Sequence, residues 1–262
     1  MIRSRDIITA TTLALVACLF AASAHGSGNW RNVEPVRETI GERDPIPEGL
    51  ELDLPMVSED GGNINLGISF QGELKEDEHL ESIQVFAARN PQAPVIGLEL
   101  TPAVTRAEFA TRIRLAETQY VHAVAVSNQG RVWNAAREVR VTVSGCLMDD
   151  RDESPPRMET PRVALGGNPA AGEPFLVRTM VNHPMETGLR DGEPAPGIEQ
   201  HLVDSMTVAQ GGRDLFRARF HTGTSANPYV QFHLTLDEPG DLTVTWQDQD
   251  GETVSSQQSL TF

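Results

Sequence analysis

Apolar and polar side chains alternate with a period of two along much of the chain beyond residue 60. In the first half the alternation covers residues 64–70, 83–85, 96–100, 109–115 and 139–143, and residues 120–126 form a nearly continuous apolar run. Successive side chains of a β-strand point to opposite faces, so alternation indicates strands buried on one side. The continuous run indicates a central strand. The chain is therefore predicted to be all-β.

The second half of the chain shows the same alternation, over residues 175–181, 216–220, 230–236 and 242–246. Asp250-Gly251 is a strong signal for a hairpin turn between two strands. Short strands separated by turns such as Asn90-Pro91 are typical of a β-sandwich. Residues 25–60 are rich in proline, glycine and charge and show no helical periodicity, so no helix is expected there.

A linker is predicted between the two halves. Residues 147–173 are rich in acidic residues, proline and glycine, as in Ser154-Pro155-Pro156 and Gly166-Gly167. This is the composition of a flexible connection. We expect one β-sandwich over residues 25–146 and another over residues 174–262, which are ordinary domain sizes.

The first 24 residues have the anatomy of an export signal. Arg3 and Arg5 precede an apolar stretch, and Ala22-Ser23-Ala24 supplies the small residues of a cleavage site. The stretch is too short for a membrane span. An alternative is lipidation at Cys18, although Leu19 and Phe20 continue the apolar run beyond it. We expect a periplasmic protein with no membrane span.

The mature chain would be strongly acidic. The full sequence has a net charge of −16, and removing Arg3, Arg5 and Asp6 with the signal subtracts a net +1 and gives −17. Nucleic acids and anionic membranes are bound by basic surfaces, so neither is an expected partner.

Cleavage of the signal leaves Cys146 as the single cysteine of an exported protein. It follows the last predicted strand of the first half, in Ser144-Gly145-Cys146-Leu147-Met148, at the start of the linker. The alternatives are a buried, inert thiol and an exposed one. The end of a strand favours exposure. The acidic linker should raise the pKa of the Cys146 thiol above the ordinary value of about 8.5, which suits a handle activated by other proteins.

Enzyme and metal sites have weak support. A cysteine hydrolase requires a positioned histidine, but His183, His201, His221 and His233 lie in no recognisable catalytic context. Met180, His183 and Met185 are close in sequence and form a weak copper alternative. No catalytic residue, resident metal or cofactor is predicted.

Several segments resemble the SoxY and SoxZ families of the bacterial sulfur-oxidising (Sox) system. The SoxY resemblance rests on residues 82–86, Asn90-Pro91, residues 111–119 and the run Val-Arg-Val-Thr-Val-Ser-Gly-Cys at residues 139–146. The SoxZ resemblance rests on residues 178–188, 225–229 and 245–248. The chain thus resembles a SoxY–SoxZ fusion over nearly all of its mature length.

The resemblance implies two immunoglobulin-like sandwiches that associate tightly, and we expect them to pack face to face. It also implies that thiosulfate-derived sulfur is attached to Cys146 by a haem enzyme and processed by other Sox enzymes, while the carrier itself performs no step. The arm departs from the family pattern, because Leu147 and Met148 follow the cysteine where the family has glycines and the chain continues beyond them.

The predicted function is a non-enzymatic carrier of sulfur on Cys146. Ser144, Gly145, Leu147 and Met148 form the arm, and Sox-type enzymes are the partners. The alternative is a binding or assembly module for a periplasmic quinoprotein dehydrogenase, since fused carriers also resemble proteins associated with such enzymes. An exposed Cys146 would also allow a disulfide-linked dimer.

Overall fold

A computed structural model of the chain describes residues 28–143, 158–190 and 193–262. The predicted signal, Cys18, Cys146 and the other four arm residues lie outside this part. Within it, no helix is long and apolar enough to cross a membrane.

The first half is built from strands with one short helix. It comprises η1 (Trp30–Asn32), α1 (Glu34–Ile40), β1 (Leu50–Asp53), β2 (Val57–Ser58), β3 (Ile64–Phe70), β4 (Leu80–Ala87), β5 (Pro94–Leu100), β6 (Glu108–Ile113), β7 (Gln119–Ser127) and β8 (Val132–Val141). Each segment predicted from alternation overlaps a strand.

The described part of the second half contains strands and no helix. They are β9 (Arg162–Gly166), β10 (Pro174–Met180), β11 (Leu189–Arg190), β12 (Glu193–Pro194), β13 (Val203–Gln210), β14 (Arg213–Phe220), β15 (Tyr229–Thr235), β16 (Gly240–Asp248) and β17 (Thr253–Leu260). The turn predicted at Asp250-Gly251 joins β16 to β17, and Gly251 has the positive φ of 86° that this position requires. The all-β prediction is confirmed, and each half is an immunoglobulin-like sandwich.

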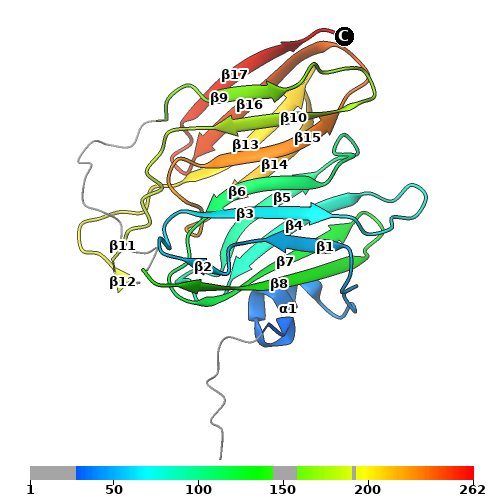
Figure 1. Ribbon diagram of the computed structural model, residues 1–262. Helices are drawn as coiled ribbons and strands as arrows, with labels where there is room; N and C mark the ends of the chain where they lie inside the picture. The colour runs from blue at the N-terminus through cyan, green and yellow to red at the C-terminus, as the bar shows by residue number, and fades with distance from the viewer. Residues whose placement is uncertain (1–27, 144–157, 191–192) are drawn as a thin grey trace, which may run out of the picture.

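The two sandwiches are joined edge to edge (Figure 1). One sheet has the strand order β1-β3-β6-β15-β10-β9 and the other β17-β16-β13-β14-β5-β4-β7-β8-β2, so both sheets run through both halves. The junctions are antiparallel pairs, β5 with β14 and β6 with β15. The expected face-to-face packing is therefore wrong. Pairing satisfies the backbone groups that each domain's edge strands would otherwise leave open.

A single hydrophobic core continues across the junction. Phe109 of the first half stacks on Phe216 of the second at 6.1 Å between ring centroids, and Phe216 stacks on Phe232 at 4.2 Å. All three rings are buried. Aromatic packing of this kind adds about 0.5–1.5 kcal/mol per pair beyond area burial, so the halves share one interior.

Helix α1 and several strands, β9 and β13 among them, were missed by the sequence prediction. Helix α1 covers one end of the nine-stranded sheet, where Val36 and Ile40 pack with Phe86 and Val124. It is only seven residues long, too short to reveal a helical period. Strand β9 lies inside the stretch predicted as linker, so that prediction is wrong for residues 162–166. This strand forms because β10 offers it an open edge.

Candidate functional site: the arm base

The sequence places the functional thiol at Cys146, and the structure describes the chain on both sides of the arm. Before it, β8 ends at Val141 and the described chain continues to Val143. After it, Met158 is buried against the common core. The described chain is therefore attached to the fold on both sides of residues 144–157.

The first anchor is held by strand β2 and the loop after it. Strand β2 runs parallel to the end of β8, and the amide of Thr142 donates to the carbonyl of Ser58 at 3.0 Å. The amide of Gly61 donates to the carbonyl of Val143 at 2.9 Å. We call residues 56–61 and 142–143 the arm base. The backbone is thus fixed up to three residues before Cys146.

The surface of the arm base is unusually apolar. Met56 is 73% exposed, Val57 50% and Val143 52%, which makes them the three most exposed large apolar side chains of the described chain. The alternation predicted Val143 to face the interior, which is wrong because β8 ends two residues earlier. Exposed apolar clusters of this kind mark contact surfaces.

Arg114 connects the arm base to the second half. The amide of Leu115 donates to the carbonyl of Gly61 at 2.8 Å. The adjacent guanidinium of Arg114 donates from Nη1 to the carbonyl oxygen of Met185 at 2.8 Å and from Nη2 to that of Pro184 at 3.0 Å. The sequence prediction put Arg114 on the solvent side of its strand. It is only 5% exposed, because β6 ends at Ile113 and the alternation stops there.

A chain of hydrogen bonds continues from Met185 through two histidines. The amide of Met185 donates to Nδ1 of His183 at 3.0 Å, and Nε2 of His183 lies 3.0 Å from Nδ1 of His201. Nε2 of His201 lies 3.1 Å from Asp250 and 3.5 Å from Asp248. Since Nδ1 of His183 accepts, its proton is on Nε2, and His201 then donates from Nε2 to the carboxylates. These hydrogen bonds thus assign the neutral tautomer of each of the two histidines.

The environment of His183 disfavours its charged form. Burial lowers its pKa, the neighbouring His201 and Arg114 lower it further, Asp248 opposes them, and the result is about 4. The pKa values of His221 and His233 are also lowered, in each case mainly by burial. Of the four candidate histidines, the structure brings together only His183 and His201.

The copper alternative is not supported by these contacts. Both ring nitrogens of His183 are engaged, and the sulfur of Met185 accepts a hydrogen bond from the amide of Val203 at 3.3 Å. Across residues 28–143, 158–190 and 193–262, no group of three or more His, Cys, Asp or Glu residues is placed to hold a metal ion.

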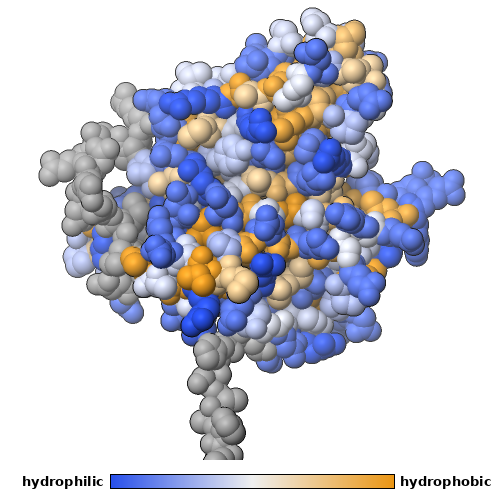
Figure 2. Space-filling view, in the orientation of Figure 1, coloured by the Kyte–Doolittle hydropathy of each residue, from blue (hydrophilic) through white to orange (hydrophobic). Residues whose placement is uncertain are grey.

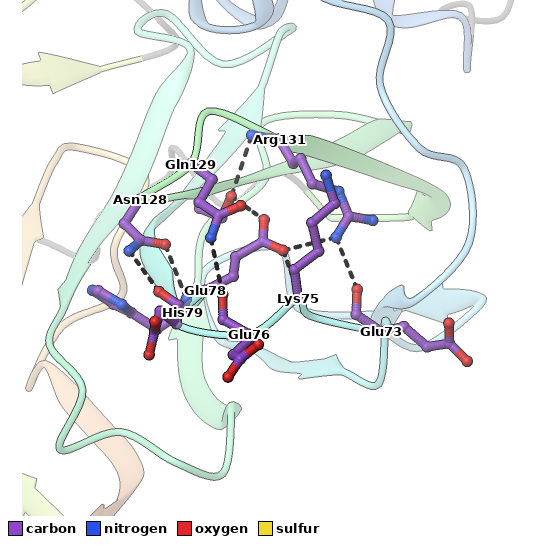
Figure 3. Close-up of polar contacts among 10 residues, drawn as sticks. Glu73, Lys75, Glu76, Glu78, His79, Asn128, Gln129 and Arg131 are labelled. Atoms are coloured by element: carbon purple, nitrogen blue, oxygen red, sulfur yellow. Dashed lines mark hydrogen bonds and ion pairs between the residues drawn. The ribbon is translucent and has the colours of Figure 1, made fainter.

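A second polar cluster lies at the other end of β8, around Glu78 (Figure 3). Its carboxylate accepts hydrogen bonds from Ser127 at 2.5 Å, from the amide of Lys75 at 2.8 Å and from Arg131 at 2.8 Å. Burial alone would raise the pKa of Glu78, but these hydrogen bonds outweigh it and lower the pKa to about 2. The cluster ties the loop before β4 to the turn between β7 and β8, far from the arm, and its role is structural.

Arg114, His201 and Asp248 were not singled out as site residues from the sequence. Arg114 carried one signal, a charged residue between the apolar Ile113 and Leu115 at the end of a predicted strand. His201 and Asp248 carried none, because their contact with His183 joins segments that are far apart along the chain.

The fold defines a tandem immunoglobulin-like protein, and the arm base is the apolar surface at which the described part of its first domain ends. Two family models match the chain: sulfur oxidation protein SoxY over residues 36–146 and sulphur oxidation protein SoxZ over residues 166–259. The chain belongs to these families, as a SoxY domain followed by a SoxZ domain.

One solved structure illustrates the likeness. The sulfur carrier protein SoxY from Chlorobium limicola f thiosulfatophilum is 20% identical, with a TM-score of 0.35, and the match covers 42% of this chain and 94% of that one. Among curated protein sequences, none matches this chain. The assignment therefore rests on the two family models, which match both domains to sulfur oxidation proteins.

Proposed function

We propose that this protein is a periplasmic carrier that holds a thiosulfate-derived sulfur intermediate covalently on Cys146 and presents it to partner enzymes. The observation that carries the proposal is the arm base. The backbone is hydrogen-bonded up to Val143 on an exposed, apolar end of the sandwich. Covalent geometry keeps Cys146 within about 10 Å of this anchor, so a partner that docks on the arm base can reach the thiol.

The loading step is an oxidation whose electrons leave with a partner. The Cys146 thiol and thiosulfate form a sulfur–sulfur bond, giving the S-thiosulfonate Cys–S–S–SO₃⁻, one proton and two electrons. The electrons pass to a haem enzyme of the kind that the Sox family implies. Hydrolysis by a second partner then adds water, releases sulfate and two protons, and leaves the persulfide Cys–S–S⁻ on the carrier.

The second domain supports this role structurally. Strand pairing at β5–β14 and β6–β15 and the contact of Arg114 with Pro184 and Met185 fix it beside the arm base. A partner docking at this end of the molecule would therefore contact both domains. We propose that the SoxZ domain supplies part of the docking surface.

Mass spectrometry of the protein from cells grown on reduced sulfur tests the proposal. We expect sulfur-containing adducts on Cys146, and none in the Cys146→Ser variant expressed at the same level. Native protein should also label at Cys146 with a thiol reagent in the absence of denaturant. An unmodified, unreactive Cys146 would reject the carrier function and favour the assembly module for a quinoprotein dehydrogenase.

A further inference from the structure

The outer face of the six-stranded sheet carries a hollow between strands β9, β10 and β15. In the strand register, Met180 lies between Arg162 and Tyr229, and Arg178 lies between Ala164 and Gln231. These residues share the face of the sheet that points away from the core, since the alternate positions Val177 and Thr179 are buried. The short side chain of Ala164 leaves a hollow of about 180 Å³ beside Met180 and Tyr229. We call it the arginine hollow, after Arg162 and Arg178 in its wall.

The hollow has an apolar lining and a cationic rim. A thioether, methyl groups and an aromatic ring contribute the apolar part, from Met180, Val163, Ala164 and Tyr229. Arg112 lies outside the lining, with its guanidinium 6.0 Å from the centre of the Tyr229 ring and its Nη2 donating to the carbonyl of Asn227 at 2.8 Å. In Figure 2, hydrophobic and strongly hydrophilic surface alternate over this side of the molecule.

The arginines of the hollow have no carboxylate partner among the residues that the structure describes. Within the described residues, Arg112, Arg162 and Arg178 form no ion pair with a carboxylate. Arg178 donates from Nε to Oε1 of Gln231 at 3.0 Å, and the same oxygen accepts from Tyr229 at 2.9 Å. The terminal nitrogens of Arg178 therefore remain available. Glu159, the carboxylate nearest in sequence to Arg162, accepts instead from Asn182.

Carboxylates are abundant in this chain, which has a net charge of −16, and about half of the described arginines lie beside one. The pairs are Arg31–Asp44, Arg37–Glu34, Arg89–Glu117, Arg106–Glu108, Arg131–Glu78, Arg190–Glu186, Arg217–Asp214 and Arg219–Glu99. What distinguishes the hollow is that its arginines lie together around an apolar space. Unneutralised guanidiniums around an apolar hollow leave oxyanion-binding donors free.

We propose that the arginine hollow binds a small organic anion, in which a sulfonate or carboxylate head meets the guanidiniums and a short apolar body fills the space beside Met180 and Ala164. A water molecule occupies about 30 Å³, so the hollow accommodates a body of about four carbons rather than a bare inorganic anion alone. The proposal stands independently of the sulfur chemistry on Cys146.

Titration of the full-length protein with butane-1-sulfonate, followed by amide chemical shifts, tests this site. Saturable shifts are expected at residues of β9, β10 and the start of β15. Butyrate should act similarly, while sulfate and butan-1-ol, which each lack one half of the ligand, should bind at least severalfold more weakly. Higher ionic strength should weaken the binding.

Three variants and one control localise the effect. Arg162→Gln and Arg178→Gln should each weaken sulfonate binding about two- to fivefold, as expected for an exposed charge contact, and Ala164→Phe should abolish it by filling the hollow. Arg137→Gln removes an exposed arginine of β8 at a distance from the hollow and should bind as the parent does. Three results would each overturn the proposal. The first is that all three variants bind sulfonate as Arg137→Gln does, and the second is that sulfate binds as tightly as sulfonate. The third is that no saturable shift is seen up to about 10 mM.

Discussion

Nη1 of Arg114 lies 2.8 Å from the carbonyl oxygen of Met185, and this hydrogen bond joins the SoxY domain to the SoxZ domain next to the arm base. The neighbouring residues on each side extend the connection. Leu115 binds Gly61, which binds Val143, and Met185 binds His183, which faces His201. The arm base is thereby connected to the buried His183 and the partly buried His201 of the other domain.

Truncating Arg114 should destabilise the junction between the domains. Arg114→Ala leaves the buried carbonyl oxygen of Met185 and the partly buried one of Pro184 without their charged donor, and we expect the free energy of unfolding to fall by about 2–4 kcal/mol. Chemical denaturation measures this change. The matched control is Arg217→Ala, which removes an exposed pair with Asp214 and should cost less than about 1 kcal/mol. Equal losses in the two variants would show that the Arg114 contacts stabilise the fold no more than an exposed ion pair does.

Acid should destabilise the protein through His183. Its pKa is about 4 in the folded protein against 6.5 for an ordinary histidine, so the unfolded chain binds more protons between these values. The free energy of unfolding is therefore unaffected by this group above pH 6.5 and falls as the pH drops toward 4. Below pH 4 the total loss through His183 is about 3 kcal/mol. Urea unfolding across this range gives the profile.

The substitution His183→Asn should reduce the slope of that profile, because the asparagine has no proton to gain, and the lowered pKa values of His221 and His233 leave a smaller slope. His79→Asn, outside the histidine pair, is the matched control and should keep the slope of the parent. Glu78 acts in a different window, since its lowered pKa of about 2 makes its contribution disappear only as the pH falls below 4.5. A slope between pH 6.5 and 4 that is as steep in His183→Asn as in the parent would reject the assignment to His183.

Cleaving the chain between the domains should leave them associated. Both sheets and the aromatic core cross the junction, so the contact resembles the interior of one domain. Limited proteolysis within residues 144–157, followed by size-exclusion chromatography at micromolar concentration, should show the two fragments eluting together. Separate elution would mean that the connecting segment alone holds the domains in register.

The residues after the cysteine should limit loading by a standard thiosulfate-conjugating enzyme. Leu147 and Met148 add bulk where the family has glycine, and the chain continues beyond them, so less backbone can extend into a narrow channel. We expect adduct formation on Cys146 to be slower than on an ordinary SoxYZ carrier. Glycine at both positions, with the chain ended there and the SoxZ domain supplied separately, should restore it. Equal rates in both forms, measured by mass spectrometry, would contradict this.

The strands that the sequence predicted are those with one buried face. Residues 64–70 and 230–236 alternate clearly because each strand separates the core from solvent. Strand β17 was missed because it is an edge strand whose side chains are mostly polar, with only Leu260 buried. Helix α1 and strand β9 were missed because each is short and depends on a neighbouring element, β7 for the helix and β10 for the strand.

The sequence by itself determined the all-β class, the two-domain order and the SoxY and SoxZ resemblance, because each depends on residue type and local spacing; Cys146 as the carrier residue stays a prediction. Only the tertiary structure decided that the sandwiches share their sheets edge to edge, that Arg114 is buried between them, and that His183 meets His201. Alternation indicates which face of a strand is buried, but it does not indicate which strand lies beside it. Those pairings depend on the free energy of packing the whole chain, which no local pattern contains.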